Sequence, residues 1–190
     1  MTETSAAAPA TDSRQQLLEL IKAHAIVHGR VTLSSGKEAD FYVDLRRITL
    51  SGQAAPLVGE VMLDLTADLD FDAVGGLTMG ADPVAAAMLH AAAHRGRSLD
   101  AFVVRKAEKA HGLQQRIEGP SISGRRVVVV EDTSTTGGSP LAAVEAAREA
   151  GAEVVAVAVI ADRASGAQEK IEAQSLPYVA AYSVAELGLA

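Results

Sequence analysis

The chain has 190 residues, of which 48% are hydrophobic and 3% aromatic, with a formal net charge of −7 and no cysteine. The missing cysteines exclude disulfides, thiolate metal sites and cysteine nucleophiles, and the acidic balance argues against general nucleic-acid binding. No apolar run reaches the roughly 20 residues that span a bilayer, so we expect a single-domain cytoplasmic protein with no membrane and no nucleic-acid partner.

Residues 1–12 are predicted to form a disordered tail, because they have neither the basic region nor the apolar core of a secretory signal. Leu17, Leu18 and Ile21 repeat at helical spacing and predict a helix that Asp12 or Ser13 caps and Gly29 ends. The following stretch, VTLSSGKEADFYVDLRR, reads as two short strands joined by a turn. Residues 57–69 predict a second amphipathic helix.

The rest of the chain alternates short apolar strands with helices. Helices are expected to open at Asp82-Pro83 and Ser139-Pro140, another covers 167–174, and Ser183 with Glu186 forms a capping box for a final turn. The predicted strands are FDAVGG, LDAFVVRK, RRVVVVED, EVVAVAVI and YVAAY. Strands of continuous Val and Ala between helices indicate an α/β fold with a mainly parallel sheet covered on both faces.

One stretch breaks this alternation. Residues 107–120, AEKAHGLQQRIEGP, follow a strand without any clear apolar period. A loop of this length inside a compact domain is usually a functional lid or a disordered segment. We therefore expect a flexible loop at about residues 106–120.

The stretch VVVVEDTSTTGGSP carries the strongest functional signal. Ligands of open α/β sheets bind beyond the carboxyl ends of the strands, where this strand delivers Glu131 and Asp132. The small and hydroxyl residues 133–139 leave backbone N–H groups open to an anion just before a helix, so they predict a phosphate cradle. The two acids would repel a phosphate, and we expect them to accept from hydroxyls elsewhere on the ligand. A ligand that carries a phosphate at one end and two neighbouring hydroxyls nearby fits a ribose 5-phosphate.

Other site motifs are missing. The sequence has no GxxxxGK[ST], no GxGxxG after a strand, no GxSxG and no HExxH. The alternative for residues 131–139 is an ordinary strand-turn-helix connection with polar filler. His90 and His94 lie four residues apart but lack a third metal ligand, so they are interpreted as surface residues.

VVVVEDTSTTGGS resembles the phosphoribosyl-diphosphate (PRPP) binding motif of type I phosphoribosyltransferases. Two further stretches resemble one family of these enzymes, the orotate phosphoribosyltransferases. The stretch VVRKAEKAHG resembles the catalytic loop of that family, and TLSSGKEADFYVDLR resembles its substrate hairpin. Arg163 stands where that family places the arginine that recognises orotate. The resemblance covers about residues 14–189.

The resemblance implies a type I phosphoribosyltransferase fold over residues 13–190, with a hood from about 13–50 plus the C-terminal segment. It implies transfer of ribose 5-phosphate from PRPP to orotate in pyrimidine biosynthesis, with Mg²⁺ bound through PRPP. It also implies a homodimer in which each loop closes over the neighbouring site. No residue of the chain is expected to be a metal ligand of its own.

The family's functional residues carry over to specific positions. Orotate is expected at Thr135 and Arg163, and the catalytic residues are expected to be Lys109, His111, Glu131 and Asp132. The expected PRPP-binding residues are Arg105, Lys106, Lys109, His111, Glu131, Asp132, Thr133, Ser134, Thr135, Thr136, Gly137, Gly138 and Ser139.

The sequence departs from the family pattern at two positions. Ser34 and Gly80 stand where the family often has lysine, which removes two cations directed at the diphosphate. Lys37 could partly replace the first, and the loss makes the cations of the 106–120 loop more important. Arg46 and Arg47 are interpreted as structural or as part of a subunit interface.

Several alternatives stay open. The acceptor could be a purine or another base, and the fold could serve a regulator that senses PRPP without catalysis. The charged residues of the loop could be merely solvated, with Lys106 and Lys109 pairing with Glu108. Arg163 could be a strand-end arginine paired with Asp162.

Overall fold

The computed structural model describes residues 12–32, 38–106 and 116–189. Its helices are α1 (Ser13–His24), α2 (Arg46–Thr49), α3 (Ala55–Leu65), α4 (Ala81–His94), α5 (Gly138–Glu149) and α6 (Ala167–Glu172). Its strands are β1 (Ile26–Thr32), β2 (Glu38–Val43), β3 (Ala73–Leu77), β4 (Asp100–Val104), β5 (Ile117–Glu118), β6 (Arg126–Ser134), β7 (Glu153–Asp162) and β8 (Tyr178–Ser183).

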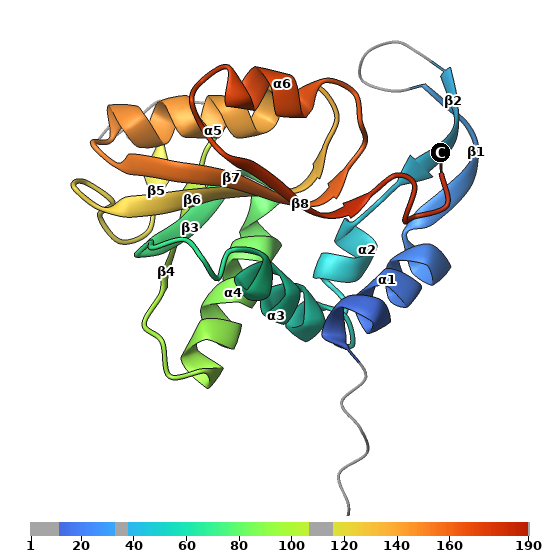
Figure 1. Ribbon diagram of the computed structural model, residues 1–190, viewed down its shortest axis with the longest axis horizontal. Helices are drawn as coiled ribbons and strands as arrows, with labels where there is room; N and C mark the ends of the chain where they lie inside the picture. Colours follow the sequence, from blue (N-terminus) through green and yellow to red (C-terminus); the bar gives the residue numbers. More distant parts are fainter. Residues whose placement is uncertain (1–11, 33–37, 107–115, 190) are drawn as a thin grey trace, which may run out of the picture.

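A six-stranded sheet forms the centre of the molecule, in the order β5-β4-β3-β6-β7-β8. All neighbouring strands are parallel except β4 and β5. Figure 1 shows α5 and α6 on one face of this sheet and α3 and α4 on the other. The predicted mainly parallel sheet with helices on both faces is confirmed.

The valine run of β6 explains why this strand reads as continuously apolar. Val128 and Val130 pack into the core on the α3 and α4 side, whereas Val127 and Val129 pack into the core on the α5 and α6 side. Successive residues of a strand point to opposite faces, so a strand covered on both sides needs apolar residues at every position. All four valines are fully buried.

A separate antiparallel hairpin of β1 and β2 stands beside the sheet (Figure 1). The C-terminal segment joins the N-terminal helix at this end of the molecule. The Tyr182 hydroxyl donates to the Arg14 carbonyl at 2.7 Å, and the Arg14 guanidinium lies 2.5 Å from the Glu186 carboxylate. The predicted capping box is present, since Ser183 and Glu186 exchange side-chain to backbone hydrogen bonds.

Several element boundaries differ from the sequence expectations. Helix α1 ends at His24, and Gly29 lies inside β1 instead of ending the helix. Helix α4 begins at Ala81 rather than at Asp82, whose carboxylate accepts from the Thr78 hydroxyl at 2.7 Å. The short helix α2 was not predicted, because four residues are too few to show a helical period.

The expected loop at about 106–120 contains one regular element. Ile117 and Glu118 form β5, which pairs antiparallel with Val104 and Val103 of β4. A strand of two residues is too short to show the alternation of apolar and polar residues by which a strand is recognised in a sequence. In the part of the chain that the structure describes, no helix is long and apolar enough to cross a membrane.

Candidate active site

A cavity of about 310 Å³ opens at the carboxyl ends of β3 and β6. The hairpin and α2 contribute one wall, the turn between β3 and α4 another, and the segment from β6 to α5 the floor. Its lining residues are Tyr42, Arg46, Leu77, Thr78, Met79, Gly80, Lys106, Glu131, Asp132, Thr133, Ser134, Thr135, Thr136, Gly137, Gly138, Ser139 and Pro140. The structure thus brings residues 131–139 together with Lys106 in one cavity.

The two acids at the end of β6 differ in their environments. Glu131 is 5% exposed, and burial, followed by the neighbouring charge of Asp132, raises its pKa to about 8. Burial also raises the pKa of Asp132, but the Thr133 N–H, which donates to its carboxylate at 2.6 Å, opposes this shift. Near neutral pH Glu131 therefore keeps its proton, because burial and the neighbouring acid both disfavour its charged form.

The loop after these acids is shaped to receive an anion. Gly137 has φ of +76°, a conformation that side chains disfavour, and it sets the direction in which α5 leaves the sheet. The first N–H groups of a helix lack intrahelical acceptors, and Pro140 has no N–H, which leaves those of Gly138 and Ser139 at the cavity. Lys170 of α6 donates to the Thr136 carbonyl at 3.2 Å and holds the loop from behind.

One hydroxyl of the predicted cradle is turned away from solvent. Ser134 is 1% exposed and its Oγ is buried beside the Tyr178 hydroxyl. Burial, followed by the nearby Asp162 carboxylate, raises the pKa of Tyr178. The Ser134 carbonyl accepts from the Arg163 N–H at 3.0 Å. Ser134 is therefore part of the support beneath the loop, although its backbone borders the cavity.

Gly80 stands against the acid pair. A Cβ at this position would lie 2.0 Å from the Glu131 Oε1 and 2.9 Å from the Asp132 Oδ1. Real Cβ contacts are not this short, so the Glu131 carboxyl occupies the space that any side chain at residue 80 would need. A side chain at residue 80 would therefore require the Glu131 carboxyl to move from its present position.

Arg46 is a cavity residue that sequence reasoning missed. Its Nε donates to the Asp44 carboxylate at 2.8 Å and its Nη2 donates to the Tyr42 hydroxyl at 3.2 Å. The hydrogen bond to Asp44 raises the pKa of Arg46, and the charge of Arg46 slightly opposes the rise that burial causes in the pKa of Asp132. Arg47, which the sequence grouped with it, does not line the cavity and lies 3.7 Å from Asp44.

The ends of the predicted catalytic loop meet at the sheet edge. The Arg105 N–H donates to the Arg116 carbonyl at 2.8 Å, and the Arg105 guanidinium lies 3.2 Å from the Glu118 carboxylate. Lys106 lines the cavity, whereas Arg105 does not. Lys109 and His111 lie outside the described residues.

Arg163 connects the loop to the hairpin. Its guanidinium carbon lies 5.9 Å from the centroid of the Phe41 ring, and its N–H binds the Ser134 carbonyl. Thr135 lines the cavity, but Arg163 is not among the lining residues. The two residues expected to bind orotate are therefore close in the chain fold but border different spaces.

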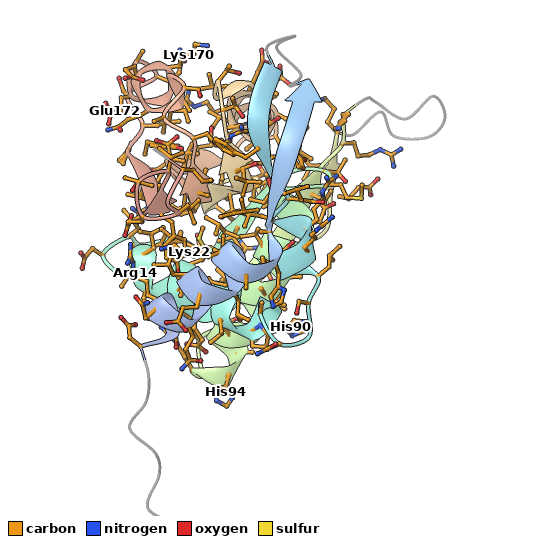
Figure 2. All side chains as sticks on the ribbon, turned by 90° about the vertical axis from the view of Figure 1, so that its right-hand side faces the viewer. Arg14, Lys22, His90, His94, Lys170 and Glu172 are labelled. Atoms are coloured by element: carbon orange, nitrogen blue, oxygen red, sulfur yellow. The ribbon has the colours of Figure 1, made fainter. Side chains whose placement is uncertain are left out.

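The described residues offer no metal centre of their own. Within residues 12–32, 38–106 and 116–189, no three His, Asp or Glu side chains are placed to hold a metal ion together. Figure 2 shows His90 and His94 on α4, at the end of the molecule away from the hairpin, and both are exposed.

Comparison with known proteins identifies the family. The family model for the phosphoribosyl transferase domain matches residues 53–177. The orotate phosphoribosyltransferase of Streptomyces avermitilis is 78% identical over 179 residues, which cover 94% of this chain and 98% of that protein. The chain belongs to the orotate phosphoribosyltransferase family. The Corynebacterium glutamicum orotate phosphoribosyltransferase is 58% identical and covers 94% of this chain and 95% of its own.

Solved structures of orotate phosphoribosyltransferases share the fold. The Mycobacterium tuberculosis enzyme in complex with PRPP superposes with a TM-score of 0.81 at 53% identity, covering 93% of this chain and 99% of that one. The predicted type I phosphoribosyltransferase fold and the predicted family are therefore confirmed, as is the assignment of the chain as an enzyme.

Proposed function

We propose that this orotate phosphoribosyltransferase transfers ribose 5-phosphate from PRPP to N1 of orotate, giving orotidine 5′-monophosphate and diphosphate in pyrimidine biosynthesis. The observation that carries the proposal is the acid pair of β6, which leads directly into a loop and helix start with free N–H groups in one cavity of about 310 Å³. The PRPP complex of the Mycobacterium tuberculosis relative supports PRPP as the substrate.

The 5-phosphate is assigned to the segment from Thr135 to Ser139. The N–H groups of Gly138 and Ser139 are the direct donors, together with the hydroxyls of Thr135, Thr136 and Ser139. Charge-assisted bonds of this kind are shorter and stronger than neutral ones, and the helix start adds to them. Thr133 connects the acid pair to this segment. Ser134 supports the segment from inside the protein and is not expected to bind the phosphate through its hydroxyl, which is buried.

The acid pair is assigned to the ribose. Glu131 and Asp132 accept from the 2′- and 3′-hydroxyls, and they lie near the positive charge that develops at C1. Glycosyl transfer passes through an oxocarbenium-like state, which a fixed carboxylate stabilises electrostatically. Because Glu131 holds a proton in the free protein, binding of the sugar hydroxyls is coupled to the protonation of the pair.

Mg²⁺ fits this cavity as an ion brought by the substrate. Glu131 and Asp132 are the only carboxylates among the described lining residues, and Mg²⁺ is usually held by one or two carboxylates plus substrate phosphates and waters. When bound through PRPP, the ion supplies positive charge to the diphosphate. Glu131 and Asp132 are the carboxylates that would contact an ion held in this way.

Orotate and the closing loop are assigned from the family resemblance. Arg163 and Thr135 bind the orotate carboxylate and ring oxygens, and Arg105, Lys106, Lys109 and His111 neutralise the leaving diphosphate while the loop excludes water. We also propose a homodimer in which each loop serves the neighbouring site, and a cytoplasmic location. Sedimentation analysis tests the dimer.

A panel of acceptor bases tests the function. The protein is mixed with PRPP, Mg²⁺ and either orotate, uracil or adenine, and base consumption is followed by absorbance. Orotate alone should be consumed, with diphosphate formed in equal amount. Arg163→Ala should reduce orotate use strongly, while Arg148→Ala, an exposed arginine of α5, serves as the control. Consumption of another base, with orotate untouched, would contradict the proposal.

A further inference from the structure

We propose that Arg46 binds the diphosphate group of PRPP and is the fixed cation of this cavity. The inference rests on PRPP as the substrate and goes beyond the residues that the family resemblance assigns. It converts Arg46 from an expected structural or interface residue into a substrate-binding residue.

The charge balance of the cavity favours a further cation beside those of the loop. Among the described residues that line the cavity, the cationic side chains are Lys106 and Arg46 alone, and they face the acids Glu131 and Asp132. PRPP brings a phosphate and a diphosphate, and the backbone N–H groups near residue 138 account for the phosphate. A diphosphate in the same cavity needs cations to offset both its own charge and that of Asp132.

Position 80 cannot supply this cation. Residue 80 is a glycine, and the Glu131 Oε1 lies 2.0 Å from the place that a Cβ would take. The turn between β3 and α4 therefore has no cationic side chain at residue 80. The cation that binds the diphosphate comes from another wall of the cavity. Arg46, on α2, stands on such a wall.

The Arg46 side chain is held in place before any ligand arrives. Asp44 binds its Nε at 2.8 Å and the Tyr42 hydroxyl binds its Nη2 at 3.2 Å, while its Nη1 has no hydrogen-bond partner among the described residues. Ile48, in the same short helix, is 1% exposed and anchors α2 in the core. An arginine fork fixed at one edge presents its remaining N–H groups to a phosphate oxygen without further loss of side-chain freedom.

The orientation of the ribose indicates that Arg46 binds the diphosphate of PRPP and not its 5-phosphate. The acids hold the 2′- and 3′-hydroxyls, and the diphosphate leaves from C1, the next ring atom. The 5-phosphate lies at the opposite end of the sugar, toward Gly138. Arg46 lines the cavity from α2, on a different wall from the Gly138 end that takes the 5-phosphate, so we place it against the diphosphate.

Ligand binding to two arginine variants tests the proposal. Arg46→Ala is compared with Arg47→Ala, which removes a neighbouring charge that also lies near Asp44 but outside the cavity. The probes are PRPP, inorganic diphosphate and orotidine 5′-monophosphate, each measured by calorimetry with Mg²⁺ present. Arg46→Ala should weaken PRPP and diphosphate by about 10- to 100-fold and the monophosphate by less than about threefold. Arg47→Ala should match the wild type for all three.

The outcomes separate this inference from the function itself. Equal weakening of PRPP and orotidine 5′-monophosphate would assign Arg46 to the acid pair or the fold and overturn the inference, as would wild-type diphosphate binding in Arg46→Ala. Arg46→Lys, which keeps the charge but not the fork, should recover part of the diphosphate affinity; no recovery beyond Arg46→Ala would also count against it. Turnover of orotate by the wild type tests the function independently, because it requires no variant.

Discussion

The Glu131 carboxyl packs against the backbone of Gly80, with its Oε1 2.0 Å from the place a Cβ would take. This contact joins the end of β6 to the turn before α4. The Glu131 carboxyl fills the space beside Gly80, and its burial raises its pKa to about 8.

Gly80→Ala should therefore displace the Glu131 carboxyl. We expect kcat/KM for PRPP to fall by at least about tenfold, because a shifted acid no longer meets the ribose hydroxyls, which is equivalent to about 1.4 kcal/mol or more of transition-state stabilisation. Gly52→Ala is the control, since a Cβ there has nothing within 4 Å. Steady-state kinetics decide the matter: equal rates for the two variants would show that the carboxyl adapts freely.

The stability of the ligand-free protein should depend on pH through Glu131. Its pKa is near 4.5 when unfolded and about 8 when folded, so between these values the unfolded chain has released a proton that the folded chain keeps. The free energy of unfolding then falls as pH rises, by up to about 1.4 kcal/mol per pH unit, and the loss is complete above pH 8.

Glu131→Gln removes this dependence. Relative to the wild type, the variant should gain stability as pH increases from about 5 to 8 and keep that gain at higher pH. Urea unfolding at several pH values measures it, and Glu145→Gln, a change at an exposed residue of α5, serves as the control. A difference between Glu131→Gln and wild type that stays constant with pH would show that the buried acid does not hold the proton.

The side-chain hydroxyls of residues 133–139 should differ in how much they contribute to PRPP binding. Ser134→Ala removes a buried hydroxyl that lies under the loop, so KM for PRPP should stay within about threefold of the wild type. Ser139→Ala removes an exposed hydroxyl at the helix start and should raise KM by about tenfold, as expected for loss of a bond to a charged oxygen. The reverse order of effects would place the 5-phosphate beneath the loop instead of above it.

Residues 131–139 could be recognised from sequence as a candidate site because they are contiguous. Strand β6, the two acids, the small residues and the start of α5 follow one another in the chain, and local backbone geometry brings their N–H groups to one place. The valine run likewise shows a strand buried on both faces without reference to any distant residue.

The tertiary structure decided which distant residues meet this loop. The sequence does not distinguish Arg46 from Arg47. In the structure both lie on helix α2, which was not predicted, and Arg46 lines the cavity whereas Arg47 does not. In the sequence, Gly80 is noted only as the absence of a lysine that the family often has. The structure shows that the Glu131 carboxyl lies against this glycine. Local sequence patterns specify strands, turns and helix ends, but contacts between separate elements depend on how their side chains pack, and no single stretch of sequence encodes that.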